Sequence, residues 1–237
     1  MGQLNFAHSD AFKIDQITKS HEHDEEAFKR SSLALSVKTA VQLLCLQAMR
    51  WACAKVHLDL FDGRGKKAID VGSAYGYIAN VLDRLQYDTV ALDISKYALM
   101  AGEKVSRIQG DAQNLPFKSD SVNIITCFDT LEHLHQPILL LKNSYRCLCK
   151  GGVLLIENPV ENPMDTFSDK LHRMGEIHCS LLNPGEFISI VRTVGFHTAE
   201  KGLLPVPFQR FPVLGRFIEI PVPISMARRV LIAAKKD

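Results

Sequence analysis

The stretch AIDVGSAYGYIA, residues 68–79, runs from an apolar strand-like segment through a turn with two glycines into a helix-like segment. Asp70 lies in the apolar segment, and Gly72 and Gly76 bracket the turn. Glycines let a backbone approach a ligand closely, and the start of a helix offers free N–H groups. The spacing D-x-G-x-x-x-G lacks two glycines of the dinucleotide turn G-x-G-x-x-G. The turn therefore indicates a ligand that has no pyrophosphate.

Two further carboxylates follow the next apolar segments. Asp93 ends the run VALD, and Asp111 with Ala112 follows a short run at 105–109. In an open α/β sheet, ligands lie at the carboxyl ends of the strands, where a carboxylate such as Asp93 can accept both hydroxyls of a ribose. A helix N-cap is the alternative role, which we consider weaker because Ser95 is available to cap. Asp111 could accept an amino group of a flat ring that lies against Ala112, although taken alone this segment is an ordinary loop.

The elements that must position these residues alternate along the chain. Residues 32–56 repeat apolar side chains at helical intervals, without proline or glycine, and predict one long amphipathic helix. Short β-branched runs then alternate with helical stretches, and RRVLIAAKK predicts a final strand. This alternation predicts an α/β fold with a parallel sheet covered on both faces. The runs are 68–71, 89–92, 122–128 and 152–156, and the helical stretches are 75–86, 95–104, 137–149 and 184–194.

Composition excludes several classes of protein. The 237-residue chain is 46% hydrophobic and has a formal net charge of only +2, which argues against nucleic acid as a partner. Its cysteines lie mostly in apolar runs, and Cys147 and Cys149 form C-x-C without a second pair, so we predict structural thiols and no metal site. The start is unlike a signal peptide, and no apolar stretch reaches about 18 residues. These features predict a cytoplasmic protein with no transmembrane segment.

Residues 203–226 differ from the rest, because five of the ten prolines lie there among large apolar side chains. Proline donates no backbone hydrogen bond, so we expect neither a regular strand nor a helix interior in this segment. A proline-stiffened connection packed on the body is the simpler interpretation. The functional alternatives are a wall of an apolar substrate pocket, or a peripheral contact with a membrane or partner.

Together the motifs resemble the class I S-adenosylmethionine-dependent methyltransferases, especially the small-molecule group that includes the ubiquinone and menaquinone methyltransferases. The resemblance covers about residues 66–160, including LPF, LEHL and LCKGGVLLIENP. It implies a doubly wound, mostly parallel, seven-stranded Rossmann-like sheet with an antiparallel last strand. It also implies S-adenosylmethionine as cofactor and S-adenosylhomocysteine as product. The implied cofactor-binding residues are Asp70, Gly72, Ser73, Ala74, Tyr75, Gly76, Asp93, Ile94, Asp111, Ala112, Phe128 and Asp129.

The chain departs from the family pattern at a few positions. Ala74 stands where the family usually has glycine, and we expect the turn to bind its ligand but to be tighter there. Ser121-Val122-Asn123 replaces the usual S-F-D, and Lys150 replaces a common proline. None of these changes removes a group that the resemblance assigns to the cofactor.

Two histidines are candidate general bases, which assist methyl transfer when the acceptor is a phenol or an alcohol. His133 falls after the fourth strand, in LEHLHQP, and His178 follows a long irregular segment. A surface or capping role is the alternative for each histidine. We expect residues 1–60 to form an N-terminal arm and helical cap, and residues 61–237 to form the cofactor-binding domain with the proline-rich insertion at about 203–226.

The leading hypothesis is a methyltransferase that acts on a small, partly hydrophobic molecule, with O-, N- and C-methylation all open. The alternatives are a non-catalytic sensor or scaffold that binds the cofactor, and a protein methyltransferase. A nicotinamide-dependent oxidoreductase is disfavoured by the glycine spacing. Base methylation is disfavoured because FDTL stands where an N-P-P-Y-type tetrad would be. The oligomeric state is open, with a homodimer as one option.

Overall fold

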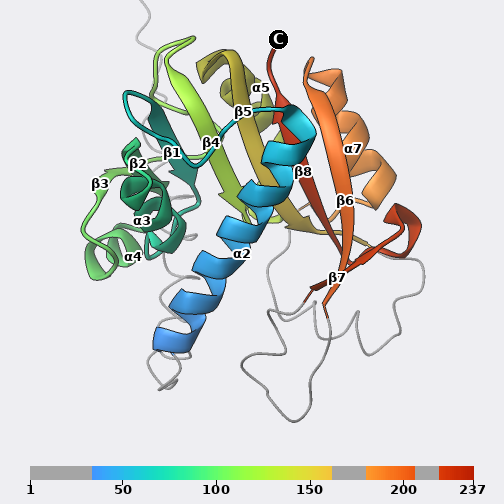
Figure 1. Ribbon diagram of the computed structural model, residues 1–237, viewed down its shortest axis with the longest axis horizontal. Coiled ribbons are helices and arrows are strands. Elements are labelled where there is room, and N and C mark those ends of the chain that lie inside the picture. The colour runs from blue at the N-terminus through green and yellow to red at the C-terminus, as the bar shows by residue number, and fades with distance from the viewer. Residues whose placement is uncertain (1–33, 162–179, 206–218) are drawn as a thin grey trace, which may run out of the picture.

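The computed structural model describes residues 34–161, 180–205 and 219–237, and an eight-stranded sheet runs through their centre (Figure 1). The strands are β1 (Lys67–Val71), β2 (Asp88–Asp93), β3 (Ser106–Gln109), β4 (Val122–Phe128), β5 (Leu148–Pro159), β6 (His197–Pro205), β7 (Glu219–Val222) and β8 (Arg229–Lys235). Their order across the sheet is β3-β2-β1-β4-β5-β8-β6-β7. Strands β1 to β5 pair in parallel, which confirms the predicted fold class.

The strand directions define two edges of the sheet. The carboxyl ends of β1 to β5 lie at one edge, called here the carboxyl edge, and their starts lie at the other, the amino edge. β8 runs antiparallel to both β5 and β6, so it confirms the predicted antiparallel last strand. Because Arg229 is opposite Pro159 in the register, the start of β8 lies at the carboxyl edge.

The strand count and one segment differ from the prediction. The sheet has eight strands rather than seven, and the additional strand β7 lies inside residues 203–226, where we expected no regular strand. That expectation was wrong for residues 203–205, which end β6, and for Glu219–Val222, which pairs antiparallel with β6. Within the described residues β7 pairs with β6 alone, so Pro221 lies on an edge strand, where a missing N–H is tolerated.

Five α-helices in the described residues cover the sheet, and they fall where the periodicity predicted them. They are α2 (Ala34–Val56), α3 (Tyr77–Arg84), α4 (Lys96–Ala101), α5 (Pro137–Cys147) and α7 (Pro184–Thr193), with short 3-10 turns η1 (Leu131–His133) and η3 (Ile224–Met226). Local signals fix their starts: Ser95 Oγ accepts from Ala98 N at 3.2 Å, and Asn183 forms a capping box with Glu186. Proline occupies the first turn of α5 and of α7.

Two apolar layers hold the helices to the sheet. α2 crosses one face in Figure 1, and its buried Cys45, Met49 and Ala52 pack in one cluster with Ile124 and Leu155 of the sheet. A second cluster, on α5, α7 and the other strand faces, contains Leu140, Leu141, Phe187, Ile125 and Leu154, all less than 1% exposed. Neighbouring residues of β4 therefore point into opposite layers, as expected for a sheet buried on both sides.

The first half of α2 reaches the carboxyl edge. Gln42 Nε2 donates to Asn80 Oδ1 on α3 at 3.2 Å, and Lys38 forms an ion pair with Glu103, which follows α4. The helix therefore belongs to the layer that supports the turn after β1. The division into a cap at 1–60 and a domain at 61–237 stays a prediction, because residues 1–33 lie outside the described part of the chain. No helix in the described ranges is long and apolar enough to cross a membrane.

Candidate functional site

The turn after β1 has an unusual backbone. Gly72, Ala74 and Gly76 all have left-handed φ angles, of 69°, 44° and 71°. Glycine adopts such angles freely, whereas an alanine is strained by its Cβ. The sequence predicted a tighter turn at Ala74, and in the structure this residue has a strained, left-handed φ angle.

Packing against the segment after β4 also requires glycine at the start of this turn. A Cβ on Gly72 would lie 2.0 Å from Thr130 Oγ1, which is closer than any two such atoms can approach. The backbone N–H of Gly72 donates to Leu92 O at 2.8 Å and that of Ser73 to the same oxygen at 3.1 Å. The turn is therefore fixed between the ends of β2 and β4.

Asp70 lies beneath the turn and is buried, with 2% of its surface exposed. Its carboxylate accepts a hydrogen bond from Thr126 Oγ1 at 2.7 Å and one from the backbone N–H of Ala79, in α3, at 3.2 Å. Burial raises the pKa of Asp70 to about 7, and the charge of Asp93 adds to this rise. Asp70 thus links β1, β4 and α3. Its predicted role towards the cofactor stays a prediction.

Asp93 lies between the turn and the start of α4. Its Oδ2 accepts from the backbone N–H of Ala74 at 2.7 Å, and its Oδ1 accepts from that of Ser95 at 2.8 Å. Each carboxylate oxygen has a second lone pair, so both can still accept a hydroxyl. Ser95 caps α4, as the sequence predicted. Asp93 therefore joins the turn to the neighbouring strand end and keeps acceptor capacity there.

The end of β3 lies beside Asp93. The backbone N–H of Gly110 donates to Asp93 O at 2.9 Å, which brings the following Asp111 to the same edge. Asp111 is exposed and accepts from the backbone N–H of Gln113 at 2.8 Å, whereas Ala112 is buried. Together with Ile94, which is half-buried, they form the side of the site that the sequence assigned to a flat ring.

The opposite side of the site is built by the segment after β4. Phe128 packs on the α2 layer, and Asp129 has a left-handed φ of 47°, with its N–H donating to Glu157 O at 3.0 Å. The Asp129 carboxylate forms an ion pair with Arg229 Nη2, and Arg229 Nε donates to Glu157 Oε1 at 2.6 Å. An arginine from the far end of the sequence therefore reaches the carboxyl edge.

His133 lies on η1, directly after this segment, and 40% of its side chain is exposed. Its Nε2 is 3.8 Å from Oε1 of the buried Glu132. The backbone of η1 is held by Ser180, since Ser180 N donates to Glu132 O at 3.0 Å and Ser180 Oγ donates to Leu131 O at 3.1 Å. His178, the other candidate base, lies outside the described residues.

The structure brings most of the predicted residues to one edge, beside Glu157 and Asn158 at the end of β5, and it adds Arg229, which no sequence motif indicated. Ser73, one of the predicted cofactor-binding residues, has a buried Oγ without a hydrogen-bond partner among the described residues. Asn158 Oδ1, at the end of β5, is likewise buried without a partner among them. Glu157 and Arg229 complete this edge. An antiparallel last strand is the signal that could have placed Arg229, because its start then lies beside the parallel strand ends.

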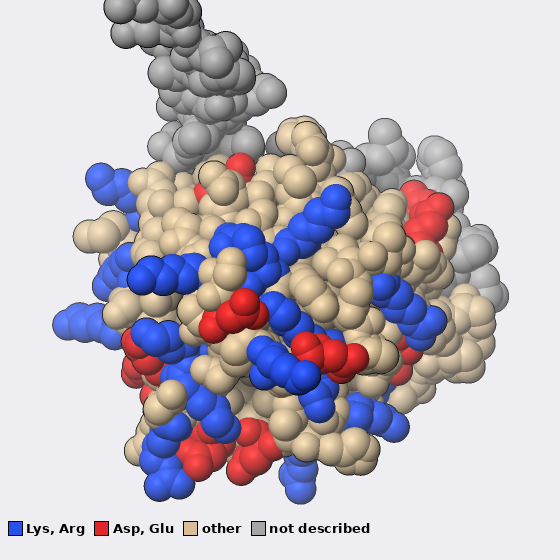
Figure 2. Space-filling view, turned by 90° about the horizontal axis from the view of Figure 1, so that it is seen from above, with Lys and Arg blue, Asp and Glu red and all other residues tan. Residues whose placement is uncertain are grey.

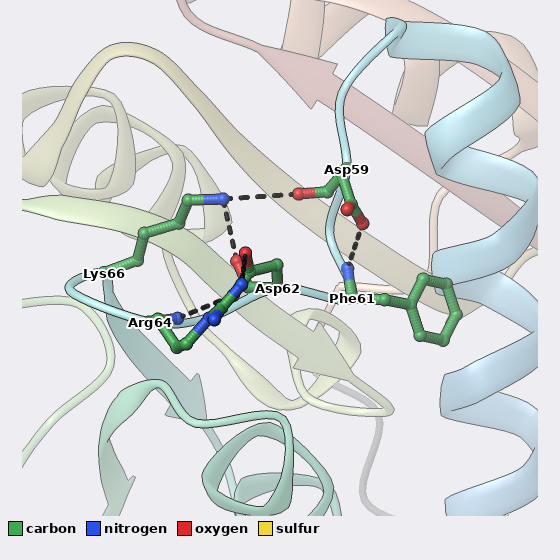
Figure 3. A network of polar contacts seen from close by, with 5 residues as sticks. All are labelled: Asp59, Phe61, Asp62, Arg64 and Lys66. Atoms are coloured by element: carbon green, nitrogen blue, oxygen red, sulfur yellow. Dashed lines mark hydrogen bonds and ion pairs between the residues drawn. The ribbon is translucent and has the colours of Figure 1, made fainter.

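A second polar cluster lies at the amino edge (Figure 3). Some of its residues line an open hollow of about 390 Å³. Arg64 donates from Nε and Nη2 to the Asp62 carboxylate, at 2.9 Å each, and Lys66 Nζ donates to Asp62 O at 2.8 Å. Arg64 is exposed, Asp62 and Lys66 are half-buried, and these groups bind one another, while the predicted residues lie at the other edge. In the described ranges, no group of three or more His, Cys, Asp or Glu residues could hold a metal ion.

Comparison with known proteins shows the family to which this chain belongs. A family model described as a methyltransferase domain matches residues 46–201. A ubiquinone biosynthesis O-methyltransferase of Aliivibrio fischeri (strain MJ11) is 29% identical over 97 residues, which cover 37% of this chain and 42% of that protein. A probable S-adenosylmethionine-dependent methyltransferase of Mycolicibacterium smegmatis is 23% identical over 140 residues, covering 57% and 54%. The chain thus spans about half the length of the curated relatives it matches.

Solved structures share the fold at low identity. A Thermotoga maritima S-adenosylmethionine-dependent methyltransferase, described as a possible histamine N-methyltransferase, has a TM-score of 0.64 at 20% identity and covers 93% of this chain and 97% of its own. Phosphoethanolamine N-methyltransferase 2 of Haemonchus contortus, in complex with S-adenosyl-L-methionine, has a TM-score of 0.60 at 18% identity and covers 73% and 49%. Since the family model matches more than half of the chain, this protein belongs to the methyltransferase domain family, within the class I S-adenosylmethionine-dependent methyltransferases.

Proposed function

We propose that this protein transfers the methyl group of S-adenosylmethionine to a small, partly hydrophobic molecule. The observation that carries the proposal is the double contact of Asp93, which accepts from Ala74 in the turn and from Ser95 in α4. This contact fixes a carboxylate with free lone pairs beside a glycine turn, at the edge where α/β sheets bind ligands.

The residues of the carboxyl edge suit the chemistry of this cofactor. The buried Ser73 hydroxyl has no partner in the described chain, and a hydroxyl can both donate and accept. Asp93 can accept the two ribose hydroxyls, and the exposed Asp111 can accept an amino group of the adenine. When bound, the cofactor supplies a methyl group on a positively charged sulfur. The protein residues orient it and exclude water from the acceptor.

The proposed cofactor contacts follow the order of the strands. The turn from Gly72 to Gly76 with Asp70 beneath it would hold the methionine portion, and Asp93 with Ile94 would hold the ribose and one adenine face. Asp111 and Ala112 would bind the adenine edge. Phe128 and Asp129 would lie towards the methyl group and the acceptor.

His133 is our candidate for the general base when the acceptor is a phenol or an alcohol. It is half-exposed on η1, directly after Asp129, so it can contact a small molecule at this edge. His178 remains a second candidate. Relatives carry names for O-methylation, and structural neighbours carry names for N-methylation, so we leave the accepting atom open. We further propose that residues 1–60 and the insertion at 203–226 supply the apolar walls of the acceptor pocket.

The experiment is a methyl-transfer assay with labelled S-adenosylmethionine on separate panels of catechols, aliphatic amines and amino acids. We expect label transfer to at least one panel by the wild type and none by Asp93→Ala. His133→Ala should lose transfer to a phenol but keep S-adenosylhomocysteine binding. If the wild type bound the cofactor, transferred no label to any panel and co-purified with a partner protein, these results would favour the sensor or scaffold alternative instead.

A further inference from the structure

One arginine connects three strand ends at the proposed site. Arg229 begins β8, and its guanidinium binds Glu157 at the end of β5 and Asp129 after β4. These partners are 72 and 100 positions away in the sequence. The three side chains, called here the Arg229 cluster, hold two carboxylates and one guanidinium. Its formal charge is therefore −1.

The charge of the Arg229 cluster is not distributed evenly. The Glu157 side chain is 3% exposed and lies inside the sheet layer, while 58% of the Asp129 side chain is exposed. A buried carboxylate needs its cation, because an unpaired buried charge is costly. Arg229 therefore compensates Glu157 first, and the open side of the cluster is the Asp129 carboxylate.

Asp129 lies beside the glycine turn. The next residue, Thr130, is the one that a Cβ on Gly72 would strike, and Thr130 Oγ1 donates to Phe128 O at 2.9 Å. The Asp129 N–H donates to Glu157 O at 3.0 Å, so its left-handed backbone is held from β5 as well as by Arg229. The net negative side of the cluster is thereby fixed next to the place proposed for the cofactor.

The cofactor and its product differ in one charge at this place. S-adenosylmethionine carries a positive sulfur, which becomes neutral in S-adenosylhomocysteine. A fixed carboxylate nearby attracts the first more than the second. We propose that the Arg229 cluster, through Asp129, determines the preference of the site for the charged cofactor over its product, with Arg229 as a positioning residue. This inference rests on the proposed function, and it explains how the site could hold the product less tightly than the cofactor.

The matched control is at the other end of β4. Asp120 also has a left-handed φ, of 51°, and it also pairs with a cation from the end of β8, since Lys236 Nζ is 2.7 Å from its Oδ1. Asparagine tolerates left-handed angles as aspartate does, so Asp129→Asn and Asp120→Asn each remove one charge without changing the backbone requirement. Arg229→Lys is the third variant, because it keeps the cation and changes only its geometry.

The test measures calorimetric dissociation constants of S-adenosylmethionine and S-adenosylhomocysteine for each variant, without an acceptor. In Asp129→Asn the affinity for S-adenosylmethionine relative to S-adenosylhomocysteine should fall about three- to tenfold. Asp120→Asn should keep the wild-type ratio. Arg229→Lys should change it by less than about twofold while lowering both affinities. Raising the salt concentration should reduce the wild-type ratio, because the Asp129 carboxylate is exposed.

The outcomes separate this inference from the proposed function. An unchanged ratio in Asp129→Asn, or an equal fall in Asp120→Asn, would overturn the inference while the site itself stands. If neither ligand binds the wild type, the proposed function fails. A thermal melt of each variant checks that it is folded before titration. If Arg229→Lys bound S-adenosylhomocysteine as tightly as the wild type but had an altered ratio of the two affinities, the positioning role of Arg229 would be contradicted.

Discussion

An aspartate with a left-handed backbone flanks β4 at each edge of the sheet, Asp120 before the strand and Asp129 after it. The two aspartates differ in what surrounds them. At the amino edge, Lys236 binds Asp120, donates to Leu148 O at 2.7 Å and lies over the Tyr145 ring. One cation there meets one carboxylate. At the carboxyl edge, Arg229 is shared by two carboxylates beside the glycine turn. A left-handed aspartate paired with a cation therefore lies at both ends of the strand, and among the described side chains of the Arg229 cluster one negative charge is left over.

The amino edge satisfies its polar groups locally. Figure 2 shows this face of the molecule with acidic side chains interspersed among the basic ones. In the loop before β1, Asp62 and Arg64 bind each other in the exposed network of Figure 3. At the carboxyl edge, by contrast, Ser73 Oγ and Asn158 Oδ1 are buried without a partner in the described chain. A bound ligand could complete the hydrogen bonding of these two buried groups.

The first prediction compares two glycines that have the same backbone conformation but different surroundings. Gly72 and Gly65 have φ angles of 69° and 70°, but a Cβ on Gly72 would meet Thr130, whereas a Cβ on Gly65 would have no other atom within 4 Å beyond its chain neighbours. Gly72→Ala should lower the free energy of unfolding by about 3 kcal/mol or more, from strain and overpacking. Gly65→Ala should cost about 1 kcal/mol, from strain alone. Urea denaturation measures both, and equal costs would contradict the close packing at the carboxyl edge.

The second prediction concerns the pH dependence of stability. Burial raises the pKa of Asp70 to about 7, so the native state keeps a proton that the unfolded chain releases above its ordinary value of 3.8. The free energy of unfolding should therefore fall as the pH rises from about 4 to about 7, by up to about 4 kcal/mol. Asp70→Asn should remove this slope, since its amide can donate to Thr126 Oγ1 and accept from Ala79. Urea titrations at several pH values that give parallel slopes for both proteins would refute it.

The third prediction is a small gain in stability when the backbone strain at Ala74 is relieved. Its φ of 44° is left-handed, so Ala74→Gly should raise the free energy of unfolding by about 1 kcal/mol. Gln86 has a φ of 70° in the exposed loop before β2 and provides the control Gln86→Gly, for which we expect a similar gain. A loss of stability in Ala74→Gly beside a gain in Gln86→Gly would show that the Cβ of Ala74 makes a packing contact.

The smallest effect should come from Asp62. Hydrogen bonds from Arg64 hold the pKa of Asp62 well below its usual range, so this group loses its contribution only as the solution becomes strongly acidic. The pair lies at the surface, with 75% of the Arg64 side chain and 43% of the Asp62 side chain exposed, and such pairs contribute little to stability. Asp62→Asn should leave the urea midpoint unchanged at pH 7. A large shift of the urea midpoint at pH 7 would mean that the ion pair of Asp62 and Arg64 contributes substantially to stability.

Sequence patterns predicted the local features of this molecule better than its long-range ones. The turn from Gly72 to Gly76, the capping Ser95 and most elements follow from spacing, because neighbouring residues determine them. β7 was missed because Pro221 argues against a strand unless its edge position is known. Arg229 was missed as a site residue because only the antiparallel register of β8 brings it to Glu157 and Asp129.

The most direct test is calorimetric titration of the wild type, Asp93→Ala and Asp120→Asn with S-adenosylhomocysteine, with NADH as the control ligand. We predict saturable binding of S-adenosylhomocysteine to the wild type and to Asp120→Asn, at least about tenfold weaker binding to Asp93→Ala, and no binding of NADH. Loss of two hydroxyl acceptors accounts for that factor. Equal affinity in Asp93→Ala, or binding of NADH alone, would contradict a cofactor site at the carboxyl edge.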